Sequence, residues 1–111
     1  MNRLLTLLAL VTLATASALG QHSVALTCTD TTPNVTFDFY RGAVTGGPYT
    51  IINPSTLVMC SYTDTQVTGG ATYFYVATAS LNGSTSTYSN EVKAVVPQTP
   101  TSPTLNPPVV K

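Results

Sequence analysis

The side chains able to do acid–base chemistry are few in this 111-residue chain, and they are scattered along it. The acidic residues are Asp30, Asp38, Asp64 and Glu91, and His22 is the one histidine. Catalysis needs such groups to converge, and a serine or threonine nucleophile needs a neighbouring base that this inventory does not supply. We therefore expect no catalytic residue and a protein that is not an enzyme.

Metal and cofactor chemistry have equally little to build on. Two cysteines and one histidine do not make a zinc site, and the glycine pairs at 46–47 and 69–70 have no helix after them to form a phosphate loop. Four Lys/Arg against four Asp/Glu create no field that would attract nucleic acid or an anionic membrane surface. We expect no metal, no cofactor and no nucleic-acid partner.

Residues 1–20 have the layout of a secretory signal peptide, with a polar start, the apolar run Leu4–Ala16 and small residues up to Gly20. The run is too short to span a bilayer comfortably, and a buried N-terminal helix is the alternative interpretation. Cleavage is predicted after Ala18 or Gly20. Gln21 stands where a lipoprotein would need a cysteine, so no membrane anchor is expected. The protein is predicted to be secreted, to the periplasm or outside the cell.

The C-terminal residues 97–111 are rich in proline and threonine. Proline blocks helix and central strand and favours extended, solvated chain, so this segment is predicted to be a flexible tail or linker. The folded domain is therefore expected to span residues 21–96.

Within that domain, apolar residues alternate with period two, and no stretch carries a helical period. The alternation turns Asp64 inward, whereas Asp38 and Glu91 fall on outward faces. Short strands without helices predict an all-β sandwich or small barrel. The strands are predicted at 24–29, 35–40, 48–52, 60–67, 72–80 and 88–96.

The runs "VALTCTDTTPNVTFDFYRG", "GGPYT", "SYTDTQVTGGATYFYVATA" and "YSNEVKA" resemble, in order and spacing, a fibronectin type III domain of secreted bacterial proteins. The resemblance covers residues 22–96. It implies an immunoglobulin-like sandwich of two antiparallel sheets, with Tyr73 as the structural tyrosine whose hydroxyl bonds backbone in the turn before its strand. The inward-facing residues would be Val24, Leu26, Cys28, Val35, Phe37, Phe39, Tyr62, Val67, Tyr73, Tyr75, Ala77, Val92 and Ala94.

Two departures from the family pattern concern the first strand of this chain, 24–29. The family usually has a tryptophan at the position of Cys28, and this chain contains none. The family also has an earlier strand, strand A, which pairs with this one (strand B). Little chain lies between the predicted cleavage site and residue 24, so strand A is expected to be short or missing.

Cys28 and Cys60 are expected to form a disulfide, because an exported chain meets an oxidising compartment and its cysteine count is even. In the resembled fold their strands are antiparallel neighbours. A bridge would stabilise the domain by roughly 3 to 4 kcal/mol, which compensates for the absent tryptophan and strand A. Two free buried thiols are the alternative.

The expected function is binding. Tyr40, Phe74 and Val76 would form an outward apolar patch, which is either a docking site or ordinary apolar surface. The first hypothesis is a secreted binding or adhesion module that contacts another protein or a cell-surface component. The alternative is a carbohydrate-binding or accessory module of an extracellular polysaccharide-degrading system, with polysaccharide as a partner.

The edge of the strand at 24–29 is the expected contact region if strand A is missing. An uncovered edge offers unpaired N–H and C=O groups, and this stretch contains neither proline nor charge. A partner's strand could add there. The alternative is that the tail beyond Val96, or residues left by a later cleavage, covers the edge in the same chain.

Overall fold

The structure is a computed structural model, and it describes residues 22–111. The predicted signal peptide and its cleavage site therefore lie outside the described residues. Within the described part all regular structure is strand, as the alternating sequence pattern predicts. The strands are β1 Val24–Thr27, β2 Thr36–Gly42, β3 Thr50–Ile51, β4 Ser61–Asp64, β5 Thr72–Leu81, β6 Ser84–Thr85 and β7 Val92–Val95.

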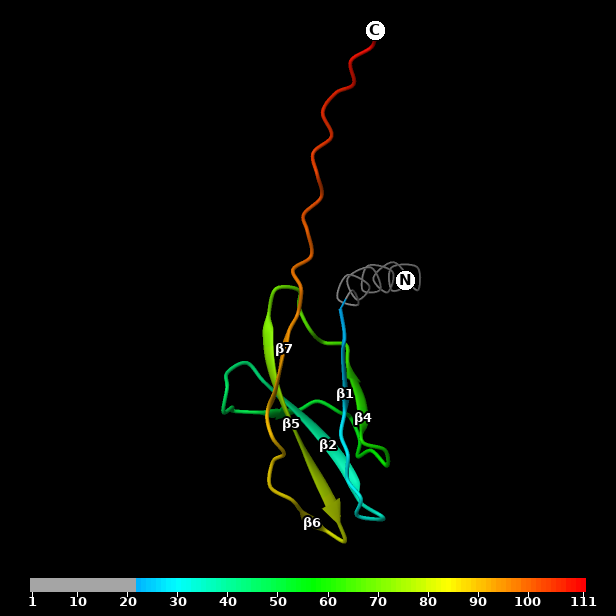
Figure 1. Cartoon of the computed structure of the whole chain (residues 1–111), viewed down its shortest axis with the longest axis vertical. Coiled ribbons are helices and arrows are strands. Elements are labelled where there is room, and N and C mark those ends of the chain that lie inside the picture. Colours follow the sequence, from blue (N-terminus) through cyan, green and yellow to red (C-terminus); the bar gives the residue numbers. More distant parts are fainter. Residues whose placement is uncertain (1–21) are drawn as a thin grey trace, which may run out of the picture.

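The strands form two antiparallel sheets packed face to face (Figure 1). The smaller sheet contains β1 and β4, which pair from Val24 opposite Asp64 to Thr27 opposite Ser61. The larger sheet has the order β3-β2-β5-β6, and β7 pairs with β5 beyond the hairpin to β6. Among the described residues, no strand precedes β1 to pair with its outer edge.

The core lies between the sheets and follows the alternation of the sequence. Leu26 of β1 packs with Phe39 of β2 and with Tyr75 and Ala77 of β5, all of which are buried. Tyr62 of β4 adds a ring stacked near Phe39, with centroids 6.2 Å apart. Burial of these side chains is the main term that holds the two sheets together.

The chain enters and leaves the sandwich at the same end (Figure 1). His22 Nε2 lies 2.9 Å from Thr99 Oγ1, and the Gly70 N–H donates to the carbonyls of Val96 and Pro97. Beyond these contacts the segment to residue 111 is extended and exposed, and it leads away from both sheets. The tail therefore does not cover the edge of β1.

Candidate functional site

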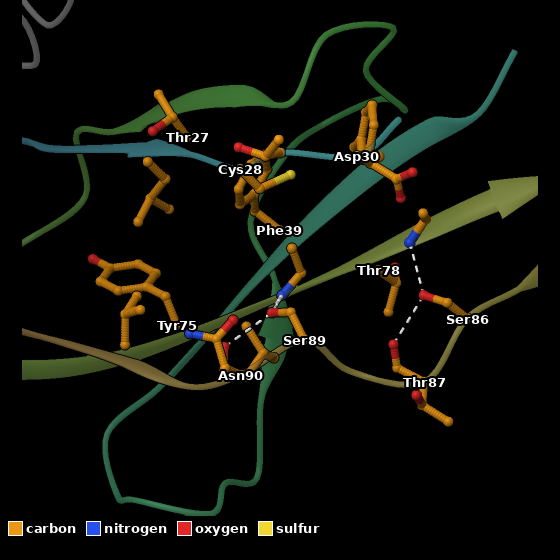
Figure 2. Close-up of a pocket in the computed structure, with 17 residues that line it drawn as sticks. Thr27, Cys28, Asp30, Phe39, Tyr75, Thr78, Ser86, Thr87, Ser89 and Asn90 are labelled. Atoms are coloured by element: carbon orange, nitrogen blue, oxygen red, sulfur yellow. Dashed lines mark hydrogen bonds between the residues drawn. The ribbon is translucent and has the colours of Figure 1, made fainter. Parts of the chain in front are cut away.

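A cleft of about 520 Å³ opens between the sheets along the outer edge of β1 (Figure 2). We call it the open cleft. Its floor is formed by core side chains of β2 and β5, one wall by β1 and the residues after it, and the other wall by the segment 86–92. The residues that line it include Leu26, Thr27, Cys28, Asp30, Phe39, Ala77, Ala79, Ser86, Ser89 and Val92.

The wall at 86–92 is held to β5 by two serines in place of a regular ladder. Ser86 and Ser89 donate their N–H groups to the carbonyls of Ala79 and Ala77, and their hydroxyls accept the N–H groups of the same two alanines at 2.9 and 2.8 Å. From the first of these pairs to the second, the segment 86–92 advances by three residues while β5 advances by two. The segment therefore contains a β-bulge. For this reason β7 begins at Val92, later than the strand predicted at 88–96.

The Cys28–Cys60 disulfide is present and joins the two strands of the smaller sheet at one end, with the Cα atoms 5.2 Å apart. Cys60 packs against the core, whereas Cys28 lines the open cleft and is exposed. Val92, on the opposite wall, is 47% exposed. The prediction that Cys28 and Val92 are core residues was wrong. Both are exposed, because no described strand closes the sandwich over them.

The opposite side of the sandwich is closed by a buried ion pair. The Asp64 carboxylate at the end of β4 is 2% exposed and accepts two bonds from Arg41 Nη1, at 2.9 and 3.1 Å. It also accepts the Tyr75 hydroxyl at 2.8 Å and the Gln66 N–H at 3.0 Å. Asp64 is thus inward, as its parity predicts, and ties β4 to both central strands of the larger sheet.

Burial and the bond to Asp64 raise the pKa of the Tyr75 hydroxyl, because both disfavour the phenolate. The Tyr75 hydroxyl therefore stays protonated at neutral pH and donates to Asp64. The hydroxyl and the carboxylate are thus parts of one structural hydrogen-bond network.

On the outer face of the larger sheet the predicted apolar patch is not formed as expected. Val76 is 4% exposed, so its place in the patch was wrong. Tyr88 reaches from the far side of β5 to the ring of Tyr40 on β2, with centroids 5.2 Å apart, and so crosses over Val76. Tyr40 and Phe74 remain half-buried.

Tyr49 completes this outer aromatic cluster, which the sequence pattern did not reveal. Its ring lies 5.2 Å from that of Tyr88 at 76°, and the angle between Tyr40 and Tyr88 is 69°. Rings set edge to face stabilise one another but do not form one flat platform. The sequence pattern did not place Tyr88 on this face because the residue lies in the bulge, where alternation does not predict which way a side chain points.

Tyr73 lies at the start of β5, and its hydroxyl accepts the Thr68 N–H at 2.9 Å. This is the bond to the preceding turn that the family resemblance implies. The Arg41 guanidinium lies over the Tyr73 ring, 5.3 Å from its centroid, so the corner is linked to the buried ion pair.

The crystal structure of a Fn3-like protein from Clostridium thermocellum matches this fold with a TM-score of 0.59 and 33% sequence identity. The match covers 69% of this chain and 79% of that protein. This chain belongs to the fibronectin type III-like family. Within the family layout β1 is strand B and β5 is strand F, so the open cleft lies where strand A would close the sandwich.

A second similarity connects this Fn3-like domain to part of a much larger protein. It is 41% identical over 76 residues to an amylopullulanase from Thermoanaerobacter thermohydrosulfuricus. The match covers 68% of this chain but only 5% of the amylopullulanase. No family model matches the chain.

Glu91 of this Fn3-like domain fastens the loop between β2 and β3 to the segment before β7. Its carboxylate accepts the Thr45 hydroxyl at 2.6 Å, the Gly46 N–H at 2.8 Å and the Tyr49 hydroxyl. These bonds, from Thr45 above all, lower the pKa of Glu91, and the bond to Glu91 raises the pKa of Tyr49.

The remaining acidic side chains also serve local structure. Asp38 accepts the amide of the buried Asn53, and Asp30 accepts the Thr32 N–H. Within residues 22–111 no group of three or more His, Cys, Asp or Glu side chains could hold a metal ion. No helix in this described range is long and apolar enough to cross a membrane.

Proposed function

We propose that this Fn3-like protein is a non-catalytic accessory module of an extracellular polysaccharide-degrading system. The observation that carries the proposal is its 41% identity to a segment that makes up 5% of an amylopullulanase. The shared segment is a small part of that protein, as an accessory module would be.

The use of the carboxylates supports a non-catalytic role. Glycoside hydrolysis commonly needs two carboxyl groups that face each other across a substrate. Asp64 is buried in an ion pair, and Glu91 is bonded to a loop on the outer face of the larger sheet. Both carboxylates are thus engaged in bonds that hold the fold together.

The disulfide supports the extracellular location. Such bridges persist in oxidising compartments and are rare in the cytosol. The domain also has one small core that the bridge reinforces, as is common in secreted domains.

A binding role toward protein is favoured over one toward sugar. Tyr40, Tyr49 and Tyr88 meet edge to face, so they do not offer the flat row of rings that stacks on a polysaccharide chain. The open cleft and the edge of β1, in contrast, present groups that suit a polypeptide.

Deleting the gene from the producing organism tests the accessory role. Culture supernatant of the deletion strain should release reducing sugar from starch or pullulan more slowly than wild type, and complementation should restore the rate. The purified protein alone should release none. An unchanged rate in the deletion strain on both polysaccharides would contradict the proposal.

A further inference from the structure

We propose that the open cleft is a receptor for one extended segment of another polypeptide, which adds as a strand to the free edge of β1. The inference concerns the kind of partner and does not depend on a role in polysaccharide degradation.

The edge of β1 has the hydrogen-bonding groups that strand addition requires. The Cys28 N–H donates to the Cys60 carbonyl, so even-numbered residues of β1 point their backbone groups toward β4. The N–H and C=O groups of Ala25 and Thr27 consequently point to the open side, where no described residue pairs with them. No proline, charge or bulge protects this edge.

The cleft beside that edge offers space for the side chains of an added strand. Alternate residues of such a strand would point inward, over Leu26, Phe39 and Ala77 on the floor. A volume of about 520 Å³ exceeds by far the roughly 30 Å³ share of one water molecule. Filling it would take exposed surface of Cys28 and Val92 out of water.

The shape of the site selects a lone strand over a second copy of the module. Beyond β5 the larger sheet continues with the segment 86–92, whereas beyond β1 the smaller sheet has no further described strand. Two modules paired through their β1 edges would bring both 86–92 segments into one space. A single extended chain fits between β1 and this wall without such a clash.

The protein's own tail is a poor occupant. Prolines at 97, 100, 103, 107 and 108 remove backbone donors at intervals too short for a ladder. The start of the tail is also held near Gly70, and from there the tail leads away from both sheets (Figure 1).

The chemistry of the lining defines the partner segment. Asp30 is the one charged side chain among the described residues that line the cleft, and it lies just beyond the C-terminal end of β1. A strand antiparallel to β1 places its N-terminal end near Asp30. The segment should therefore be free of proline, apolar at alternate positions, otherwise uncharged, and cationic at its N-terminal end.

The test is hydrogen exchange followed by NMR on the secreted protein, with and without a capped hexapeptide. The peptide has an N-terminal lysine, valine at alternate positions and serine or threonine between them. We expect saturating peptide to slow the exchange of the Ala25 and Thr27 amides by about tenfold or more. The Leu26 and Cys28 amides, which already face β4, serve as internal controls and should change little.

Proline at the two edges of the smaller sheet provides matched variants, because Ala25 and Thr63 lie opposite each other and both point away from the shared ladder. Ala25→Pro should abolish the protection by the peptide, and Thr63→Pro should retain it. Should Ala25→Pro not fold, Val92→Trp fills the mouth of the cleft from an exposed position and should weaken binding at least tenfold.

Three results would overturn the proposal. The first is slow exchange at Ala25 and Thr27 in the free monomer, independent of concentration, which means that the edge is already covered. The second is a peptide that changes neither amide. The third is protection by the peptide that is as strong in folded Ala25→Pro as in the wild-type protein. If Ala25→Pro does not fold, the same comparison is made with Val92→Trp.

Discussion

The two sides of the sandwich differ in whether side chains close the space between the sheets. On the closed side, Asp64 of β4 reaches Arg41 and Tyr75 of the larger sheet, and the Tyr62 hydroxyl donates to the Ile52 carbonyl at 3.0 Å. On the open side, β1 faces the segment 86–92 across a cleft, and Cys28 and Val92 are exposed.

This difference shows that a small sandwich can remain intact with one side unfinished. On the closed side the polar groups of the described residues are bonded, and no buried side-chain nitrogen or oxygen in residues 22–111 lacks a partner. The open side is held by bonds that stay within each wall, namely the disulfide on one and the Ser86 and Ser89 bonds on the other. Stability is therefore expected to depend on the closed side and binding on the open side.

The largest effect is expected from Asp64→Ala. It removes the carboxylate that the Tyr75 hydroxyl and the partly buried Arg41 share, and Arg41 keeps only its bond to the Gln66 carbonyl. Loss of one member of a buried pair costs about 3 to 5 kcal/mol. Urea denaturation measures the change in the free energy of unfolding.

Asp30→Ala is the matched control on the open side, since this carboxylate is exposed and bonds only the nearby Thr32 N–H among the described residues. It should change the free energy of unfolding by no more than about 1 kcal/mol. Equal effects of the two substitutions would contradict the division between the sides.

The next effect in size is that of the disulfide. Cys60→Ser should lower the free energy of unfolding by roughly 2 to 5 kcal/mol, because the bridge closes a loop of 32 residues and restrains the unfolded chain. Reduction of the wild-type protein should act alike. A melting temperature that does not change with reductant would show that the bridge does not compensate for the absent tryptophan and strand A.

The smallest effect concerns Glu91 and pH. Because the folded pKa of Glu91 is below its unfolded value of about 4.3, its bonds stabilise the fold above that pH and are lost as pH falls through the folded value. NMR should show the Gly46 N–H losing its bond to Glu91 only at a pH below the unfolded pKa. Glu91→Gln should abolish that transition, and release at or above the ordinary glutamate pKa would contradict the assignment.

Much of the fold could be predicted from alternation and turn residues. The parity of Leu26, Phe37, Phe39 and Tyr75 predicts their burial, and that of Asp64 predicts its inward position. The hairpin between β5 and β6 follows from Asn82 and Gly83, which adopt φ of 51° and 82°. Parity failed for Val76 because an outward-pointing side chain is not exposed when a ring from the neighbouring segment, that of Tyr88, reaches across it to Tyr40.

The class of fold, the disulfide and the inward-facing parity could be predicted from the sequence, because period-two patterning and an even cysteine count are local properties of the chain. Which of the inward-facing residues are covered depends on the tertiary structure. Cys28 and Leu26 share one parity, yet Leu26 is buried under the opposite sheet and Cys28 is exposed in the cleft. Burial depends on which strands lie alongside and across, and that arrangement is set by pairing between residues far apart in sequence.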